Sequence, residues 1–367
     1  MRFPEFNGEW ETKLINDLAV VIGGGTPDTT IKSYWDGEIQ WFTPSEIGKN
    51  KYVDSSLRTI TEEGLNNSSA KLLPPNTILL SSRATIGECS LSLRECATNQ
   101  GFQSLVSKKC YVDFLYYLIQ TKKRDLIRKS CGSTFLEISA NEVRKIQVSV
   151  PTDVEQQKIA GLLSLIDERI ATQNKIIEDL KKLKSAIRKK MFSLLKDEYT
   201  ESFEINQLLD YEQPTAYIVA NDEYSTDTSL TPVLTANKGF ILGYTDEKFG
   251  IYQKGECIIF DDFTMDAKYV SFPFKVKSSA IKILTAKPNV NLRFMFEYLS
   301  YWELKSEGHK RHYISEIASL VIELPSKERQ SIIASLMTSL NSKLDIEAKT
   351  KIRYEEQKRY LLSQMFI

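Results

Sequence analysis

The sequence predicts an α+β protein: two mixed α/β globular domains separated by two long helices that form an antiparallel coiled coil, arranged as a pseudo-two-fold duplication. Three observations support this. The chain has 367 residues, and a single hydrophobic core stops growing at roughly 250–300 residues. A segment from the middle of the chain recurs at its end. The two remaining segments are rich in short strand signals and turns, and each carries one amphipathic helix.

The internal repeat is the strongest of these signals, because repeats identify an architecture before any single motif does. Residues 142–192 align without a gap with residues 316–366, at a constant offset of 174. The identical pairs are Glu142/Glu316, Pro151/Pro325, Gln156/Gln330, Ile159/Ile333, Ala160/Ala334, Leu162/Leu336, Lys175/Lys349, Lys184/Lys358, Met191/Met365 and Phe192/Phe366. Shared helical composition alone gives fewer matches, so the repeat indicates a true duplication.

Both copies begin with the same order of local signals. A strand-like run, Lys145–Val150 or Leu320–Leu324, ends at a proline, which cannot donate to a β-ladder. Thr152 and Ser326 then suit the N-cap of a helix, and Glu155 completes a capping box in the first copy.

A long helix is predicted to follow in each copy. In the first, apolar residues recur at three- and four-residue spacings: Leu163, Ile166, Ile170, Ile177, Leu180, Leu183, Ile187 and Met191. No Pro or Gly occurs in residues 162–194, which gives a helix of about 45–50 Å. This stripe is too narrow for a fully buried helix, so we expect the two helices to pair with each other as a spacer. The alternative is that each helix packs only on its own domain.

The globular segments, residues 1–141 and about 200–315, are predicted to contain mixed sheets. Strand signals occur at Ile39–Thr43, Thr77–Ser81, Gly101–Val106, Pro232–Leu234, Gly255–Phe260, Phe272–Val276 and Ala280–Leu284. Helices are expected at Val112–Ser130 and Leu292–Ser306. Apart from this shared order of strand signals followed by a helix, the two segments differ strongly in sequence.

Composition limits the class of protein. No apolar run is long enough to span a bilayer, and no cleavable leader is evident, so we expect a cytoplasmic protein. The five cysteines include no CxxC pair and are expected to be buried or partly buried free thiols. Lys plus Arg equals Asp plus Glu, at 48 each. This neutrality weakens a DNA-binding interpretation taken alone, although a basic stripe on one face remains compatible with it.

No catalytic or cofactor motif is convincing. The glycine run before Pro27 lacks the GxGxxG spacing, and no phosphate-binding loop of the GxxxxGK[ST] type exists. The two histidines, His309 and His312, lack an evident third metal ligand. Asp261, Asp262 and Asp266 are interpreted as a turn with solvated acids, and a nuclease site built on them is the weaker alternative. We therefore expect no catalytic residue, no bound cofactor and no metal.

Several ordered motifs resemble the target recognition domain of the specificity subunit of type I restriction–modification enzymes. These are Gly24–Pro27, Trp41–Ile47, Leu79–Gly87 and Thr98–Phe102. The run Ile146–Pro151, followed by Glu155–Ala160 and Ile166-Asp167, is similar to the entry of that family's helical spacer. The resemblance covers essentially the whole chain. The second half departs more, since no counterpart of Trp41–Ile47 or of Asn99-Gln100-Gly101 is obvious there.

The resemblance implies a non-catalytic subunit that reads double-stranded DNA. It implies docking of methyltransferase subunits, two in number, and of restriction/translocase subunits, which would hold the S-adenosylmethionine and ATP chemistry. It also implies target recognition domains at 1–145 and 199–319 and helical spacer regions at 146–198 and 320–367. Two base-reading domains on a stiff spacer would read a bipartite site, with half-sites ~34–36 Å apart if one helical turn separates them.

Candidate DNA contacts follow from side-chain chemistry. Lys and Arg neutralise phosphates, whereas base discrimination needs bidentate Arg, Asn or Gln. The candidates are Arg83, Gln100, Lys122, Lys123, Arg124, Arg128, Lys129, Ser133, Thr134, Lys238, His309, Lys310, Arg311 and Tyr313. The run Lys181–Lys190 could face DNA, a methyltransferase subunit or water. A coiled-coil adaptor that binds only proteins is the competing hypothesis.

Overall fold

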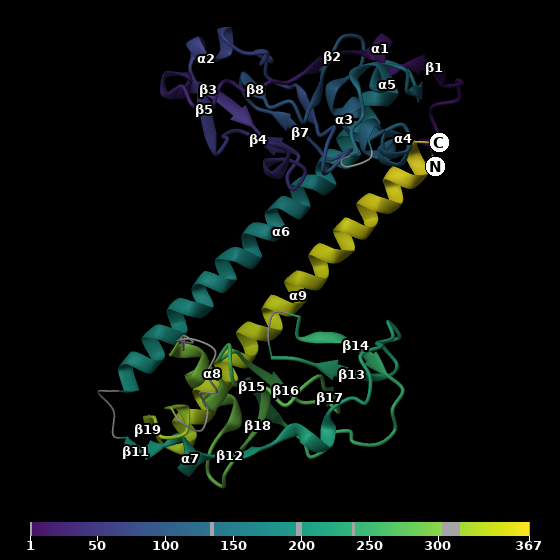
Figure 1. The fold of residues 1–367 in the computed structure, drawn as a ribbon. Coiled ribbons are helices and arrows are strands. Elements are labelled where there is room, and N and C mark those ends of the chain that lie inside the picture. The colour runs from purple at the N-terminus through teal and green to yellow at the C-terminus, as the bar shows by residue number, and fades with distance from the viewer. Residues whose placement is uncertain (1, 133–135, 196–199, 237–238, 303–315, 367) are drawn as a thin grey trace. The chain divides into compact units, whose positions relative to one another are not determined.

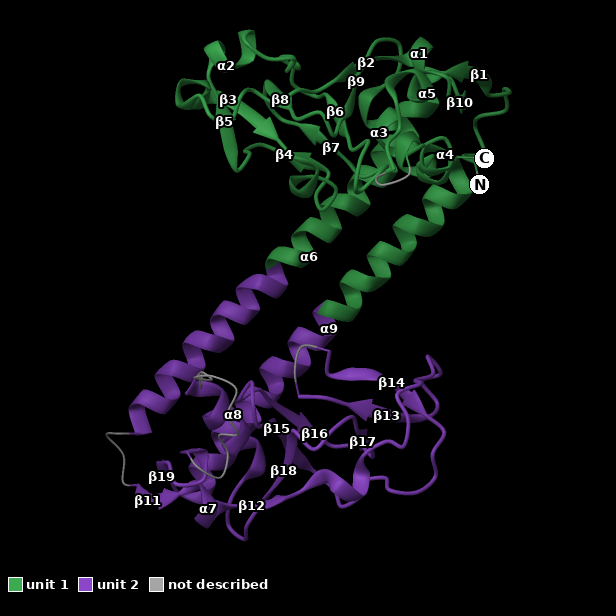
Figure 2. Ribbon diagram, in the orientation of Figure 1, with its two compact units in different colours: residues 1–175, 348–367 green, residues 176–347 purple. Residues whose placement is uncertain are grey.

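The computed structural model describes residues 2–132, 136–195, 200–236, 239–302 and 316–366. The chain divides into two compact units (Figure 2). Unit 1 contains residues 1–175 and 348–367, and unit 2 contains residues 176–347. Two long helices, α6 (Asp153–Leu194) and α9 (Lys327–Met365), each contribute to both units. The predicted fold class, a duplicated α+β protein with two long helices, is confirmed.

Unit 1 contains three sheets, whose strand orders are β2-β9-β6-β7-β4, β5-β3-β8 and β1-β10. Its elements in chain order are β1 (Glu11–Leu14), α1 (Ile15–Leu18), β2 (Ala19–Gly23), β3 (Trp35–Phe42), β4 (Tyr52–Val53), β5 (Arg58–Ile60), α2 (Glu62–Asn66), β6 (Ile78–Leu80), β7 (Cys89–Ser92), β8 (Cys96–Thr98), β9 (Gln103–Ser107), α3 (Val112–Thr121), α4 (Lys123–Arg128), α5 (Ala140–Arg144) and β10 (Gln147–Val150) (Figure 1). The β3–β8 and β4–β7 pairs are parallel and the others are antiparallel, so the sheets are mixed.

Unit 2 is built on the sheet orders β12-β18-β15-β16, β14-β13-β17 and β11-β19. Its elements are β11 (Glu201–Glu204), α7 (Ile205–Leu208), β12 (Leu209–Glu212), β13 (Thr231–Leu234), β14 (Ile241–Thr245), β15 (Cys257–Asp261), β16 (Ala267–Val270), β17 (Lys275–Val276), β18 (Ile281–Ala286), α8 (Leu292–Tyr301) and β19 (Val321–Leu324). Each of the strand signals predicted for the two globular segments overlaps a strand of its unit.

Within unit 1, α6 and α9 run in opposite directions. Asp167 of α6 forms an ion pair with Lys358 of α9 at 2.8 Å, and Arg169 lies over the ring of Tyr354. Residue numbers therefore rise along α6 as they fall along α9. Leu361 and Met365 enter the same apolar core as the first turns of α6. The alternative, in which each helix packs only on its own domain, is wrong.

Two local predictions were wrong. The single helix expected at Val112–Ser130 is two helices, because Lys122 leaves helical geometry at φ −91° and ψ 7°; an amphipathic pattern that continues across such a break cannot reveal it. The capping box expected at Glu155 is replaced by a tertiary contact. Its buried carboxylate accepts hydrogen bonds from Arg2 at 2.7 Å and from Trp10 at 3.3 Å.

The duplication extends well beyond the helices. The pairing of β1 with β10 and that of β11 with β19 have the same antiparallel form. The amide of Ile15 donates to Ile146 at 3.0 Å, and that of Ile205 donates to Leu320 at the same distance. Each short helix that follows, α1 or α7, leads into a strand of the main sheet. The two domains therefore share a framework that their sequences hide.

The repeated glutamines Gln156 and Gln330 make matching contacts at the start of the long helices. Each side-chain oxygen accepts from the amide preceding a domain helix, that of Tyr111 or of Asn291, at 2.9 Å. Each side-chain nitrogen donates to the carbonyl of the proline five residues before it, also at 2.9 Å. Both glutamines are buried. This contact explains why an amide is identical in both copies.

Replacing Gln156 with Leu is expected to destabilise unit 1, because the Tyr111 amide and the Pro151 carbonyl lose their buried partner. The expected loss is about 1–3 kcal/mol for each polar group left unsatisfied, measured as a lower urea midpoint. Gln157→Leu, at an exposed neighbouring position, is the matched control. Equal midpoints for the two variants would contradict this assignment.

Candidate nucleic-acid interface

The loop between β6 and β7 carries Arg83 and has an unusual backbone. Ala84 and Gly87 both have positive φ, at 56° and 86°. A Cβ added to Gly87 would lie 2.7 Å from Cγ of Lys123, so only glycine suits this left-handed, closely packed position. Arg83 therefore lies near one end of the loop, and Lys123 lies beside Gly87 at the other end.

A second segment lies along this loop. Arg83 forms a 2.8 Å ion pair with Glu137, and the Ile138 amide donates to the Ser82 carbonyl at 3.1 Å. On the other side, the Ser82 amide donates to Gly101 at 2.8 Å, next to exposed Gln100. Two predicted contacts, Arg83 and Gln100, are thus carried by adjoining loops of unit 1, and a third, Lys123, begins α4 beside Gly87.

The family-like motifs mostly hold these loops in place. Gly25 donates to Thr98 at 2.8 Å, and a Cβ on Gly24 would lie 2.0 Å from the Asn99 carbonyl oxygen. The Thr26 hydroxyl donates to the side-chain oxygen of Gln100. The turn that carries Gln100 is therefore held in place by contacts with residues 24–26.

Trp41 also supports this framework. It is buried, and its indole nitrogen donates to the Gly25 carbonyl at 2.9 Å. It packs edge-on against Trp35, at 5.1 Å between ring centroids, and the Arg58 guanidinium lies 3.5 Å from the Trp35 ring centroid. Arg58 carries no local sequence signal for this role, because its position over two tryptophans depends on the pairing of strands far apart in the sequence.

The remaining predicted cations of α3 and α4 lie on the surface and are mostly paired. Lys123 pairs with Glu88, Arg128 with Asp125 at 2.8 Å, and Lys129 with Glu142 at 3.9 Å. Arg124 is exposed and Lys122 is half-buried. Exposed pairs of this kind contribute only about 0–1 kcal/mol, so exchanging a carboxylate for a phosphate would cost these cations little.

Other predicted contacts lie outside the described residues. These are Ser133, Thr134, Lys238, His309, Lys310, Arg311 and Tyr313. Cys131 and Glu137, both of which are described, form an antiparallel bridge, and Glu137 also pairs with Arg83. All the DNA contacts predicted for unit 2 lie outside the described residues, so they cannot be compared with the Arg83 cluster.

Asp261 and Asp262 are not solvated, which corrects the expectation from sequence, whereas Asp266 is exposed as expected. Asp261 and Asp262 are both buried. The Asp261 carboxylate accepts from the amides of Phe263 and Thr264 at 2.9 Å, and Asp262 pairs with buried Lys282 at 3.5 Å. Within the described residues, no cluster of His, Cys, Asp and Glu is suited to hold a metal ion.

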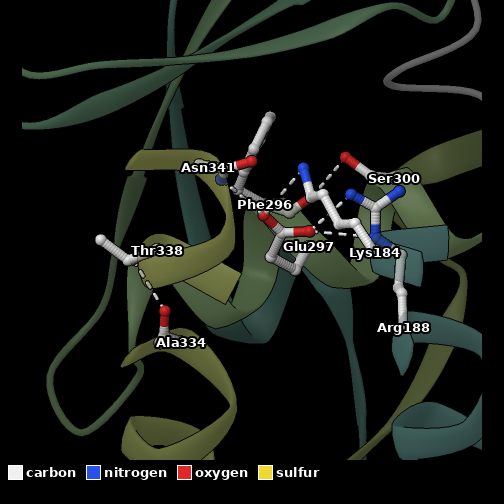
Figure 3. A network of polar contacts seen from close by, with 8 residues as sticks. All are labelled: Lys184, Arg188, Phe296, Glu297, Ser300, Ala334, Thr338 and Asn341. Atoms are coloured by element: carbon white, nitrogen blue, oxygen red, sulfur yellow. Dashed lines mark hydrogen bonds and ion pairs between the residues drawn. The ribbon is translucent and has the colours of Figure 1, made fainter. Parts of the chain in front are cut away.

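The basic run Lys181–Lys190 divides between two environments. Lys184 and Arg188 point to Glu297 of α8 (Figure 3). Burial lowers the pKa of Lys184, and the neighbouring Glu297 carboxylate opposes that shift. Lys182 is exposed and pairs with Glu178 along the same helix. At least two members of the run therefore face the protein itself.

Four of the five cysteines meet the expectation of burial. Cys89, Cys96 and Cys257 are buried and Cys110 is half-buried, whereas Cys131 is exposed, contrary to prediction. Burial raises the pKa of Cys89, Cys96, Cys110 and Cys257 to about 12. Cys131 is the accessible thiol, and it lies beside the Arg83 loop cluster.

The described helices include none with the length and apolar content needed to cross a bilayer. The architecture defines a class of duplicated α+β proteins in which each unit uses part of both long helices. A family model described as the type I restriction modification DNA specificity domain matches residues 7–182 and again residues 198–356. The chain belongs to this family, and the resemblance inferred from its motifs is confirmed.

Relatives carry the same family description in their names. The MjaIX specificity subunit of Methanocaldococcus jannaschii is 38% identical over 216 residues, covering 58% of this chain and 50% of that protein. The EcoR124I/EcoR124II specificity subunit of Escherichia coli is 39% identical over 178 residues, covering 43% of each. These alignments span half or less of those relatives. The EcoprrI specificity subunit of E. coli is 24% identical, over 87% of this chain and 84% of that protein.

Solved structures share the fold along nearly the whole chain. The crystal structure of the S subunit of the type I restriction–modification system from M. genitalium aligns with a TM-score of 0.65 and 16% identity, covering 100% of this chain and 99% of that chain. A structure described as showing complex assembly and conformational transition of the type I system aligns with a TM-score of 0.59 and 13% identity, covering 99% of this chain and 98% of that chain. At these identities the likeness concerns the fold.

Proposed function

We propose that this chain is the DNA-recognition subunit of a type I restriction–modification complex and that its two domains each read one half of a bipartite site. The observation that carries the proposal is the double match to the DNA specificity domain. The two matched halves share an antiparallel strand pair, β1–β10 or β11–β19, and a buried glutamine, Gln156 or Gln330, that accepts from the start of a domain helix. Two similar frameworks with unlike loops suit two unlike half-sites.

The proposed boundaries follow the sequence: recognition domains at 1–145 and 199–319, and helical spacers at 146–198 and 320–367. The helices are long, with 42 residues in α6 and 39 in α9. At ~1.5 Å per residue each extends about 60 Å, which exceeds the ~34–36 Å of one DNA turn.

The chemistry is assigned to partners. Methyltransferase subunits, two in the proposal, and restriction/translocase subunits dock on this chain, which itself supplies no catalytic residue, cofactor or metal. Support comes from the structural neighbour that is described in terms of complex assembly of the type I system. A chain with zero formal net charge would gain phosphate-neutralising charge from such partners.

In the first domain, Arg83, Gln100 and Lys123 are the proposed centre of the DNA contact, with Lys122, Arg124, Arg128 and Lys129 at its edge. The geometry that supports this is the adjacency of the two loops and the start of α4, where Arg83 pairs with Glu137, Gln100 accepts from Thr26 and Lys123 pairs with Glu88. In the second domain, Lys238, His309, Lys310, Arg311 and Tyr313 remain proposals from sequence.

The deciding experiment is co-expression with the methyltransferase subunit of the same restriction–modification system, followed by mapping of methylated adenines. The expected result is one bipartite motif with an unspecified gap. DNA affinity should also fall steeply with salt, by a log–log slope of ~0.9 for each phosphate neutralised. Binding to the partner without methylation or salt-dependent DNA affinity would instead favour the protein-only adaptor.

A footprint at Cys131 tests the proposed interface directly. Iodoacetamide should label Cys131 rapidly in the free protein because its side chain is exposed. The mapped duplex should slow this labelling, since Cys131 adjoins the Arg83 cluster, whereas a scrambled duplex should not. Buried Cys89 serves as the internal control in the same digest. Equal labelling rates with both duplexes would mean that the DNA interface does not include this cluster.

A further inference from the structure

The domain helices α3 and α8 can be aligned residue by residue through their glutamine contacts. Gln156 and Gln330 each accept from the amide that immediately precedes a ten-residue helix. Phe114 and Phe294 then fall at the same position, and each packs on a repeat-equivalent phenylalanine: Phe366, which directly follows α9, or Phe192 of α6. The sixth helical residue is Tyr117 in unit 1 and Glu297 in unit 2.

In unit 1, Tyr117 joins both long helices. Its buried hydroxyl donates to Asp167 of α6 at 2.6 Å. Lys358 of α9 pairs with the same carboxylate at 2.8 Å and lies 5.5 Å from the centroid of the Tyr117 ring. Lys51 also lies 4.9 Å from the centroid of the Tyr117 ring and pairs with Asp113 at 2.6 Å. Asp167 is therefore the carboxylate shared by the domain helix and the partner long helix.

In unit 2, the corresponding helix residue, Glu297, lies at the centre of a network of polar contacts (Figure 3). Its carboxylate is buried and accepts from Arg188 of α6 at 2.6 and 2.9 Å. Lys184 of α6 lies 3.9 Å from it, and Asn341 of α9 donates to it at 3.3 Å. A single side chain of the domain again contacts both long helices.

These two sets are equivalent, but their charge is placed differently. The 174-residue offset relates Lys184 to Lys358 and Asp167 to Asn341. In unit 1, the carboxylate is on the long helix and the domain presents a neutral phenol. In unit 2, the carboxylate is on the domain, and the long helix presents a neutral amide. Each set places one carboxylate beside the repeated lysine: Asp167 beside Lys358 in unit 1, and Glu297, which also binds Arg188, beside Lys184 in unit 2.

We propose that Tyr117-Asp167-Lys358 and Glu297-Asn341-Lys184 are two equivalent clamps that position each recognition domain on the helix pair. Each clamp requires both helices to be in register, because its contacts come from both. In unit 1 Lys358 of α9 pairs with Asp167 of α6, and in unit 2 Lys184 of α6 and Asn341 of α9 both contact Glu297. The residues are positioning residues for base reading, and this role rests on the proposed DNA-recognition function. The placement of the carboxylate makes the two clamps chemically distinct.

The test transplants the unit 2 clamp into unit 1 of the full chain, copurified with its methyltransferase. Tyr117→Glu alone sets two carboxylates beside one lysine, and Asp167→Asn alone leaves Lys358 without a carboxylate. Each single change should weaken binding to the mapped duplex by roughly 10-fold or more, within the range of measured pair couplings. The double variant restores one carboxylate and one amide and should recover affinity to within about threefold.

The matched control is Tyr360→Glu, the same substitution at an exposed position of α9, which should leave affinity unchanged. A double variant no better than the worse single variant would overturn the clamp. The clamp has an independent readout in hydrogen exchange of the α3 amides, which should quicken in each single variant and slow again in the double. If the unmodified chain fails to distinguish its mapped duplex from a scrambled one, the DNA function fails, and exchange alone then decides the clamp.

Discussion

Inserting four residues after Lys175 and four more after Lys349 is expected to lengthen the unspecified gap of the methylated site, with the bases of both half-sites unchanged. These two positions are equivalent in the repeat and exposed, and they lie where the long helices pass from one unit to the other. Four residues add about 6 Å to each helix. Since DNA rises ~3.4 Å per base pair, the gap should grow by one to two base pairs.

The measurement is methylated-adenine mapping of cells that express the inserted chain with its methyltransferase. Insertion after Lys175 alone is the control, because it lengthens α6 and leaves α9 unchanged. The two helices then cannot keep their contacts in both units, so either the Asp167–Lys358 pair of unit 1 or the contacts of Glu297 with both helices in unit 2 should break. That chain should lose methylation instead of changing its target. A paired insertion that methylates the original gap length would rule out the helices as the ruler.

The fold was largely predictable because the repeat is local and ungapped in the long helices. Because the offset is a constant 174 residues, one ungapped alignment identifies the pairs Gln156/Gln330 and Phe192/Phe366. The same duplication stayed hidden in the domains. Tyr111 and Asn291 are 180 residues apart, whereas Ile15 and Ile205 are 190 apart. Loops of unequal length between equivalent elements change the offset, so no single alignment shift detects them.

The candidate site was less predictable, because charge on a helix does not reveal what it faces. Lys184 and Lys182 belong to one basic run, yet Lys184 contacts a buried carboxylate and Lys182 contacts its own exposed helix neighbour. Glu297 gave no signal at all: an acidic residue in an amphipathic helix is expected to be solvated, and only tertiary packing places it against Arg188. The repeated Lys184/Lys358 pair was the one available hint.

Replacing Phe192 with Ala should strongly destabilise unit 2. The Phe192 side chain is 3% exposed and lies within an aromatic cluster. Its ring centroid is 5.6 Å from that of Phe294, 4.9 Å from Tyr298 and 5.1 Å from Tyr301. Removing a buried phenylalanine costs about 3–5 kcal/mol, because the cavity adds to the lost transfer free energy. That is a large fraction of the roughly 5–15 kcal/mol that stabilises a typical domain.

The loss should appear as a lower urea midpoint and as faster hydrogen exchange in α8, whose apolar face rests on the removed ring. Phe249→Ala is the matched control, because that ring is 75% exposed and surface changes usually stay within about 0.5 kcal/mol. Phe366→Ala, at the repeat-equivalent position, should cost less, since that ring is only partly buried against Phe114 and Trp10. If Phe192→Ala unfolds at the same urea concentration as Phe249→Ala, the end of α6 is not part of the unit 2 core, and the shared-helix framework of the two units is wrong.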